Sequence, residues 1–397
     1  MSAKAALAGM RVIGITNWAS GAYAEQLLGD MGAEIVRIEK PGRGDDARHL
    51  PPFHHGESTT YLFPNRNKKS ITLNLKAPEG VALLKRLAAK ADVVIENNRP
   101  GTLDRLGVGY EVLAKLNPRL VMTSISGFGQ TGPYRDLPAY DMNIQAITGL
   151  MSLTGMADGP PLRTGVAVSD YLAGLNAAYA TLVALLHRFR TDEGQHIDVS
   201  LYESAIAVLG TALQDQLLMG TSRTRCGNRF GALAPSNTYR CTDGWLLITV
   251  ANDAQWSRLA PLLPLDSTPD LPALEGAAQR AQHLDLLDAI VGRWTAKYTV
   301  AQATSLLSQA GIPCGAINTM ADLVADPHFR SRDVAVEVQH PTAGPMKLVA
   351  PMPKLSRTPG RVALPPPLLG QHNAEIFGTW LGIEGAELTR LSQAGVV

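Results

Sequence analysis

Short apolar runs alternate with helical segments along the first half of the chain, and this alternation limits the fold more than any other feature. It begins with an apolar run at residues 11–15, a segment with helical spacing at 21–31 and a second apolar run at 34–38. Strands joined by helices form parallel sheets with helices on both faces. The sequence therefore predicts an α/β fold with a doubly wound parallel sheet. Further strands are expected at residues 70–75, 92–96, 120–126 and 196–201, and a helix is expected to begin at Pro78.

A long helix is predicted at residues 165–190, because apolar side chains recur there at spacings of three and four. Small residues flank this stripe and allow other elements to pack closely. We expect the helix to end at Gly194 and a second apolar helix to follow at residues 202–219. The stripe consists of Tyr171, Leu175, Tyr179, Leu182, Leu186 and Phe189, and the small flanking residues are Gly174, Ala177, Thr181 and Ala184.

One carboxylate, Asp170, lies at the start of this helix in an apolar setting. Two interpretations are open. Either Asp170 or its neighbour Ser169 is an N-cap that accepts the free N–H groups of the first turn. Alternatively, Asp170 is a nucleophile, because the helix dipole keeps a carboxylate charged at this position while it faces a cleft.

Composition narrows the class of protein. The chain has 397 residues, of which 45% are hydrophobic and 18% charged, and a net charge of +1, so we expect a globular enzyme and no nucleic-acid partner. The most apolar window, residues 167–186, contains Asp170 and Asn176, so we expect no membrane span. Residues 1–10 do not have the pattern of a signal peptide, which predicts a cytoplasmic protein. Neither the histidines nor the cysteines have metal-ligand spacing, so no metal site is predicted.

The length and a change in composition predict two domains. Residues 223–240 are rich in Gly, Asn, Arg and Pro, as is typical of a linker, and a strand is expected to open the second domain at 245–250. The proline cluster at 365–367 precedes a final helix that we expect to return to the first domain. The predicted boundaries are 1–222 for the larger domain, 223–330 for the smaller domain with its linkers, and 331–397 for the returning segment.

The loops that follow the predicted strands carry the candidate chemistry, because a parallel sheet binds ligands at the carboxyl ends of its strands. The loop at 16–21 lacks the G-x-G-x-x-G fingerprint of dinucleotide enzymes. The loop at 39–48 contains Lys40, Arg43 and Arg48, which either grip a phosphate or belong to a solvated surface turn. The Pro-Gly turn and two arginines at 96–107 also suit an anion. Together these loops favour a bulky phosphorylated carrier such as coenzyme A (CoA) or a nucleotide.

Several short motifs along nearly the whole chain resemble the class III CoA-transferases. Each motif is weak alone, and the set is specific. The motifs are Gly-Met-Arg-Val-Ile at 9–13, Asn-Lys-Lys-Ser-Ile at 67–71, Arg-Pro-Gly at 99–101, Gly-Gln-Thr-Gly-Pro at 129–133, Ser-Asp at 169–170, Gly-Ile-Pro-Cys-Gly at 311–315 and Leu-Leu-Gly-Gln-His at 368–372.

This resemblance implies a Rossmann-like large domain made from both chain ends, a smaller α+β domain, and an interlocked ring-shaped homodimer. It places the family's nucleophilic aspartate on Asp170. It also implies that CoA is part of the substrate and that no cofactor is permanently bound. The CoA-binding positions carried over from the family are Ala19, Ser20, Lys40, Leu73, Asn74, Leu75, Lys76, Asn97, Asn98, Arg99, Arg105, Pro138, Ala139, Tyr140 and Asp141.

The resemblance also ranks the reactions known in the family. Racemase members carry a histidine immediately before the position of Asp141, where this chain has Tyr140, so CoA transfer is favoured over racemisation. The likeness is strongest to the succinate–hydroxymethylglutarate CoA-transferase branch, at residues 65–71 and 365–372. A dicarboxylyl-CoA such as succinyl-CoA is therefore the expected donor. The alternatives are a racemase-type isomerase and a non-catalytic module that binds CoA or a nucleotide.

Overall fold

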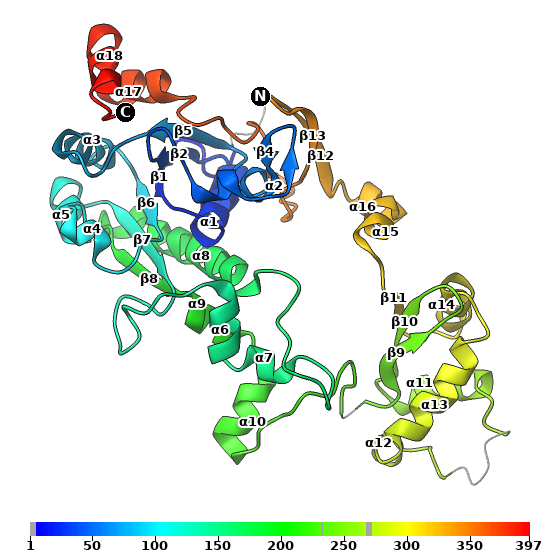
Figure 1. Cartoon of the computed structure of the whole chain (residues 1–397). Coiled ribbons are helices and arrows are strands. Elements are labelled where there is room, and N and C mark those ends of the chain that lie inside the picture. The colour runs from blue at the N-terminus through cyan, green and yellow to red at the C-terminus, as the bar shows by residue number, and fades with distance from the viewer. Residues whose placement is uncertain (1–4, 232, 267–271) are drawn as a thin grey trace. The chain divides into compact units, whose positions relative to one another are not determined.

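The computed structural model describes residues 5–231, 233–266 and 272–397, and these form two compact units (Figure 1). The first unit contains the described residues up to Met151, together with Arg163–Arg223 and Arg330–Val397. The second unit contains Ser152–Leu162 and the described residues of Thr224–Phe329. Both ends of the chain therefore belong to the first unit.

A parallel sheet of six strands forms the centre of the first unit. The strand order is β5-β2-β1-β6-β7-β8, so the direction of winding reverses between β1 and β6. The predicted α/β fold with a parallel sheet is thus confirmed. The strands are β1 (Arg11–Ile15), β2 (Glu34–Glu39), β5 (Lys68–Thr72), β6 (Val93–Glu96), β7 (Val121–Ser126) and β8 (His196–Ser200).

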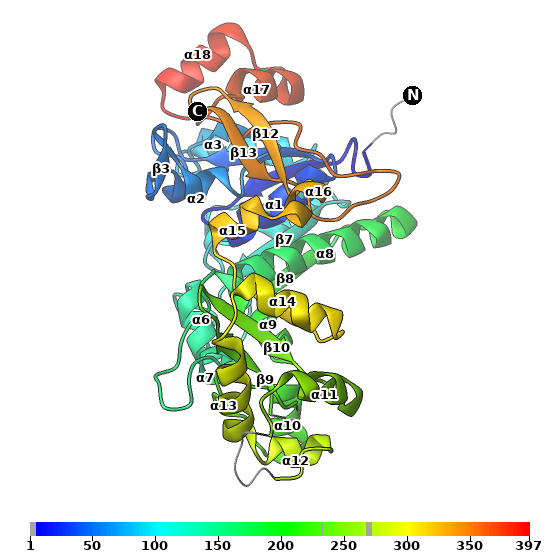
Figure 2. The same ribbon diagram turned by 90° about the vertical axis from the view of Figure 1, so that its right-hand side faces the viewer.

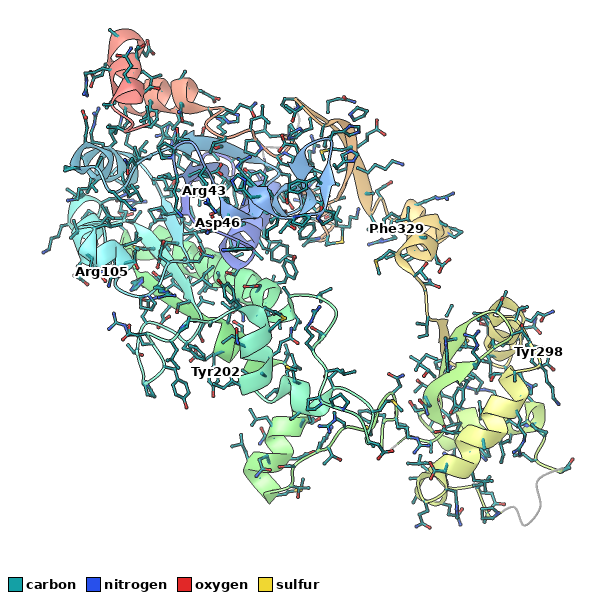
Figure 3. All side chains as sticks on the ribbon, viewed as in Figure 1. Arg43, Asp46, Arg105, Tyr202, Tyr298 and Phe329 are labelled. Carbon is teal, nitrogen blue, oxygen red and sulfur yellow. The ribbon has the colours of Figure 1, made fainter. Side chains whose placement is uncertain are left out.

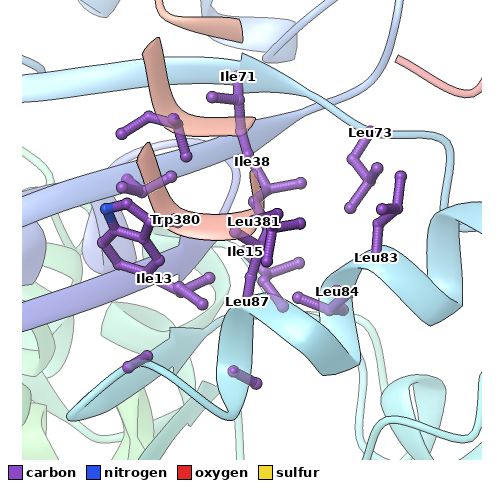
Figure 4. Close-up of a cluster of buried hydrophobic side chains, with 14 of the residues drawn as sticks. Ile13, Ile15, Ile38, Ile71, Leu73, Leu83, Leu84, Leu87, Trp380 and Leu381 are labelled. Carbon is purple, nitrogen blue, oxygen red and sulfur yellow. The ribbon is translucent and has the colours of Figure 1, made fainter. Parts of the chain in front are cut away.

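Helices cover both faces of this sheet. One hydrophobic cluster joins Ile13 and Ile71 to α3, α5 and the C-terminal helices, where Trp380 is 1% exposed (Figure 4). A second cluster joins the alternate strand residues, such as Val12 and Val93, to α1, α6, α8 and α9. The helices that contribute to these clusters are α1 (Ser20–Asp30), α3 (Pro78–Ala88), α4 (Thr102–Arg105), α5 (Tyr110–Leu116), α6 (Asp141–Ile147), α8 (Val168–Thr191), α9 (Leu201–Ala207), α17 (Asn373–Leu381) and α18 (Gly385–Gln393). Two other helices contribute no residue to them: α7 (Leu150–Leu153), which crosses the boundary between the units, and α10 (Thr211–Met219).

Several smaller elements also belong to the first unit. A single turn of 3-10 helix, η1 (Asp46–His49), follows β2, and β3 (Phe53–His54), β4 (Glu57–Ser58) and α2 (Thr59–Leu62) follow η1. The hairpin of β12 (Ala335–His340) and β13 (Gly344–Val349) packs its own small apolar cluster against Leu62.

Several sequence-based element boundaries differ from the structure by one or more residues. The strand expected at 70–75 begins at Lys68 and ends at Thr72. The helix expected at 202–219 is broken into α9 and α10, because Gly210 lies between them with φ +54°. The long helix ends at Thr191, where Asp192 adopts the left-handed conformation, rather than at Gly194.

The apolar stripe of α8 lies on the face that the first unit leaves exposed. Small residues such as Ala173, Ala177 and Thr181 lie on the buried face of α8. Because their side chains are short, α8 packs close against α1 and against β7 and β8 (Figure 2). The stripe residue Tyr179 is 67% exposed and Phe189 is 64% exposed. Within the described chain, α8 therefore packs mainly through its small residues and Leu185, whereas the stripe residues from Leu175 to Phe189 are exposed.

The second unit is built on a three-stranded antiparallel sheet in the order β11-β10-β9. Its core includes Leu246, Ile248 and Trp294. The elements are β9 (Ser236–Arg240), β10 (Trp245–Thr249), α11 (Asp253–Leu259), η2 (Ala260–Leu262), α12 (Ala277–Ala281), α13 (Leu284–Thr295), α14 (Val300–Gln309), β11 (Cys314–Ala316) and α15 (Met320–Ala325), and α16 (Pro327–Ser331) follows at the boundary with the first unit.

The described residues contain neither a candidate membrane-spanning helix nor a candidate metal-binding cluster. None of their helices is both long and apolar enough to cross a membrane. They also contain no group of three or more His, Cys, Asp or Glu side chains arranged to hold a metal ion.

Candidate active site

A cavity of about 810 Å³ opens at the carboxyl ends of β1, β2, β5 and β6. This position is where parallel sheets bind ligands, beside the point at which the winding reverses. Figure 3 shows Arg43 and Asp46 on the loop after β2, and Arg105 on α4, in this part of the first unit. The cavity is lined by Ile15, Thr16, Asn17, Ile38, Glu39, Lys40, Pro41, Gly44, Asp45, Leu73, Asn74, Leu75, Lys76, Asn98, Thr102, Arg105, Leu106 and Gly395.

Seven of the expected CoA-binding residues line this cavity. Three of them are cationic: Lys40 and Lys76 come from two different loops and Arg105 comes from α4, so their charges converge although they are far apart in the sequence. Converging cations of this kind suit a phosphorylated ligand. The other four are Leu73, Asn74, Leu75 and Asn98.

The remaining expected residues lie elsewhere. Asn97 has its side chain turned to the loop after β1, where its Nδ2 donates to the carbonyl of Asn17 at 2.7 Å. Ser20 is buried and its Oγ accepts a hydrogen bond from Asn97 at 3.4 Å. Arg99 is exposed and lies outside the lining of this cavity. Ala19 lines a second cavity, and Pro138, Ala139 and Tyr140 lead into Asp141 at the start of α6.

The second cavity, of about 260 Å³, lies at the start of α8. Its walls are mainly apolar and aromatic, and two threonines contribute hydroxyl groups. The ring of Tyr171 lies edge-on to the rings of Tyr23 and Phe63, with centroid distances of 5.2 Å and 5.8 Å. The lining residues are Trp18, Ala19, Thr59, Thr60, Phe63, Pro64 and Tyr171. Tyr171 directly follows Asp170 in α8, whereas the candidate nucleophile Asp170 itself is not among the residues that line either cavity.

Asp170 is the third residue of α8, and it does not cap the helix. The N-cap position is Ala167, whose side chain offers no acceptor, and the Oγ of Ser169 is buried without a partner. The cap comes from another helix, because Oδ1 of Asp141 accepts the N–H of Ser169 at 2.8 Å. The N-cap interpretation of Asp170 or Ser169 is therefore wrong.

The environment of Asp170 disfavours its charge, which corrects the expectation that the helix dipole keeps this carboxylate charged. Burial raises the pKa of Asp170, and the nearby carboxylate of Asp141 raises it further, to about 7. Asp141 itself is fixed by two contacts, since its Oδ2 accepts Nε2 of Gln145 at 2.6 Å and its Oδ1 caps α8. A strongly raised pKa caused by burial and a neighbouring charge marks a carboxyl group as a candidate catalytic group.

The cations expected on the loops do not all face a ligand. Arg48 binds both carboxylate oxygens of Glu39, at 2.8 Å and 2.7 Å, so it holds the loop after β2 rather than a phosphate. Lys68 is fully buried and pairs with Glu25 at 2.7 Å. Burial costs a charge much of its solvation, so these cations need the carboxylates they contact. Neither prediction for Arg48 is therefore correct, because its side chain neither is free to grip a phosphate nor belongs to a solvated surface turn.

The family model for CoA-transferase family III matches residues 7–373. This chain belongs to CoA-transferase family III. The match includes all six strands of the parallel sheet and the whole of α8, which carries Asp170.

Known members of family III align with this CoA-transferase over nearly their whole length. A succinyl-CoA–D-citramalate CoA-transferase from Chloroflexus aurantiacus is 39% identical over 391 residues, which covers 98% of this chain and 97% of the relative. A succinyl-CoA:glutarate CoA-transferase from Mus musculus is 37% identical and covers 98% of this chain and 90% of the relative. The solved structure of a CaiB/BaiF family protein from Brucella suis has a TM-score of 0.86 at 34% identity, and the match covers 95% of this chain and all of that chain.

The structure of this family III CoA-transferase also adds site residues that the sequence did not point to. Thr59, Thr60 and Phe63 line the smaller cavity, and no local pattern marks them. Gly395 reaches the larger cavity from the C-terminus. Asn17 and Trp18 lie in the first strand-to-helix loop, whose position after β1 was the available signal.

Proposed function

We propose that this enzyme transfers CoA from a dicarboxylyl-CoA, such as succinyl-CoA, to a carboxylic acid through covalent intermediates on Asp170. The observation that carries the proposal is the raised pKa of the Asp170 carboxyl group, which directly precedes Tyr171 of the aromatic cavity and belongs to the same unit as the larger cationic cavity. The printed names of the relatives from Chloroflexus aurantiacus and Mus musculus give succinyl-CoA as the donor.

The first half of the reaction removes CoA from its donor. An Oδ atom of Asp170 attacks the acyl carbon of the thioester, the carbon–sulfur bond breaks, and CoA leaves as a thiolate. The product is a mixed anhydride between Asp170 and the acyl group. The thiolate then attacks the Asp170 carboxyl carbon, which releases the donor acid and leaves an aspartyl-CoA thioester.

The second half repeats these steps in reverse order. The acceptor carboxylate attacks the aspartyl thioester and expels the CoA thiolate, which forms a second anhydride. The thiolate attacks the acyl carbon of the acceptor and restores the free carboxylate of Asp170. No external energy source is needed, because each step exchanges one activated acyl bond for another.

The two cavities divide the substrate between them in this proposal. Lys40, Lys76 and Arg105 bind the phosphates of CoA in the larger cavity. The smaller cavity receives the acyl group beside Asp170. Asn97, Arg99 and residues 138–141 complete the CoA-binding set, with Asn97 acting through the loop that it holds.

We propose that the enzyme is an interlocked homodimer, with a large domain of residues 1–222 and 331–397 and a small domain of residues 223–330. The exposed apolar stripe of α8 supports this assembly, because large apolar patches on a single chain usually mark a protein interface. Leu175, Leu186 and Phe189 on this stripe are 51%, 53% and 64% exposed in one chain.

The test is a single turnover with succinyl-CoA, followed by a second incubation with a panel of mono- and dicarboxylic acids. We expect new CoA thioesters by mass spectrometry, and a mass addition on the peptide that contains Asp170. Asp170→Asn must abolish both results, whereas the control Asp192→Asn, at the far end of α8, must retain them. Transfer at the native rate by the Asp170→Asn enzyme contradicts the proposal.

A further inference from the structure

The turn after β1 separates the two cavities of the site. Asn17 lines the larger cavity, and the next two residues, Trp18 and Ala19, line the smaller one. Trp18 has a φ of +64°, a left-handed conformation that a bulky side chain rarely adopts. Such a conformation persists only where the surrounding structure holds it in place.

The side chain of Asn17 forms a reciprocal pair with the loop after β2. Its Oδ1 accepts the backbone N–H of Asp46 at 3.0 Å, and its Nδ2 donates to Oδ2 of Asp46 at 2.8 Å. This hydrogen bond from Asn17 is the main cause that holds the pKa of Asp46 below its usual value. Both polar atoms of the Asn17 side chain, Oδ1 and Nδ2, thus form hydrogen bonds with Asp46.

The backbone of Asn17 forms a second reciprocal pair, with the loop after β6. Its N–H donates to Oδ1 of Asn97 at 2.8 Å, and its carbonyl accepts Nδ2 of Asn97 at 2.7 Å. Asn17 is therefore tied to the loops on both sides of β1. Asn97 uses its side chain for this contact.

Two further contacts fix the neighbours of Asn17. The N–H of Trp18 donates to Oδ1 of Asp45 at 3.3 Å, and Asp45 forms a fully buried ion pair with Arg37. The ring of Trp18 lies edge-on to that of Tyr140, with centroids 6.4 Å apart. Tyr140 directly precedes Asp141, the carboxylate that caps α8 beside Asp170.

We propose that Asn17 is a positioning residue that fixes the Trp18 turn and so sets the geometry between the larger cavity, which takes CoA in the proposed function, and the smaller cavity lined by Tyr171. This inference rests on the proposed function. A loosened turn displaces the wall of both cavities, so acyl-CoA is used less efficiently even when the protein is folded. The acceptor acid does not span the turn, so its KM stays near that of the native enzyme.

The test exchanges the amide and the carboxylate of the Asn17–Asp46 pair. Asn17→Asp removes the Nδ2 donor and sets two carboxylates against each other, and we expect kcat/KM for succinyl-CoA to fall about tenfold, the ratio expected for one lost hydrogen bond to a charged group. Asp46→Asn retains an acceptor for Asn17 and should change kcat/KM by less than about threefold. The double variant restores one donor and one acceptor across the pair, and its activity should return to within about threefold of the native value.

Thermal unfolding of each variant shows whether it is folded at the assay temperature. Full activity of the Asn17→Asp enzyme overturns the inference, and so does a double variant as impaired as Asn17→Asp alone, since Asn17 then acts other than through Asp46. Calorimetric binding of free CoA distinguishes failure of this inference from failure of the proposed function. If the native enzyme binds CoA but transfers it to no acid, the proposed function fails, and the CoA affinities of the same variants still decide the role of Asn17.

Discussion

Replacing the proposed nucleophile should make the protein more stable at neutral and alkaline pH, although it abolishes activity. Burial and the carboxylate of Asp141 raise the pKa of Asp170 from 3.8 to about 7. An unfolded chain loses this proton near pH 3.8, so between these values the folded state binds more protons and its free energy of unfolding falls as the pH rises. At about 1.4 kcal/mol per pH unit, the loss reaches about 4 kcal/mol at pH 8. Partial exposure of the side chain lowers this figure, so we expect Asp170→Asn to restore ~2–4 kcal/mol at pH 8.

The measurement is urea unfolding of the native and Asp170→Asn proteins at equal concentration, at pH 8 and at pH 5. At pH 5 the folded carboxyl is protonated, so the advantage of Asp170→Asn should shrink to about 1.5 kcal/mol or less. Asp192→Asn is the control, because Asp192 is exposed at the opposite end of the same helix. An advantage of Asp170→Asn that is absent at pH 8, or equal at both pH values, refutes the conclusion that Asp170 is held against its charge.

Three further predictions address the site and the assembly. Asp141→Asn removes the negative charge beside Asp170, so the pKa of Asp170 falls and the acid limb of the pH profile of kcat/KM for acyl-CoA moves to lower pH; an unmoved limb contradicts the coupling. Lys76→Ala removes a cation from the larger cavity and should weaken CoA binding about tenfold in calorimetry, whereas unchanged affinity would place the phosphates elsewhere. Leu186→Glu places a charge in the exposed stripe of α8, so the protein should sediment as a monomer, and a persistent dimer excludes this face from the interface.

Local patterns predicted the sheet because they record properties of single elements. The apolar run at 11–15 and the Pro at the first position of α3 are visible without knowing their neighbours, and both elements form where they were expected. The break between α9 and α10 was harder to predict, because the apolar pattern continues across it. Gly210 lies in this break with a positive φ of +54°, which the sequence pattern does not show. The periodicity of α8 likewise predicted a helix and did not show which face is buried within one chain.

The sequence by itself determined an α/β chain with cationic loops after its strands and an acidic residue at the start of a long helix. Only the tertiary structure decided which of those charges remain available: Lys40 and Lys76 line the cavity, whereas Arg48 and Lys68 neutralise buried carboxylates. The tertiary structure also brings the side chain of Asp141, from α6, to the start of α8. There it caps α8 and raises the pKa of Asp170. The physical reason is that hydrophobic periodicity follows from neighbours along the chain, whereas the energy of a charge depends on burial and on other charges brought close through space.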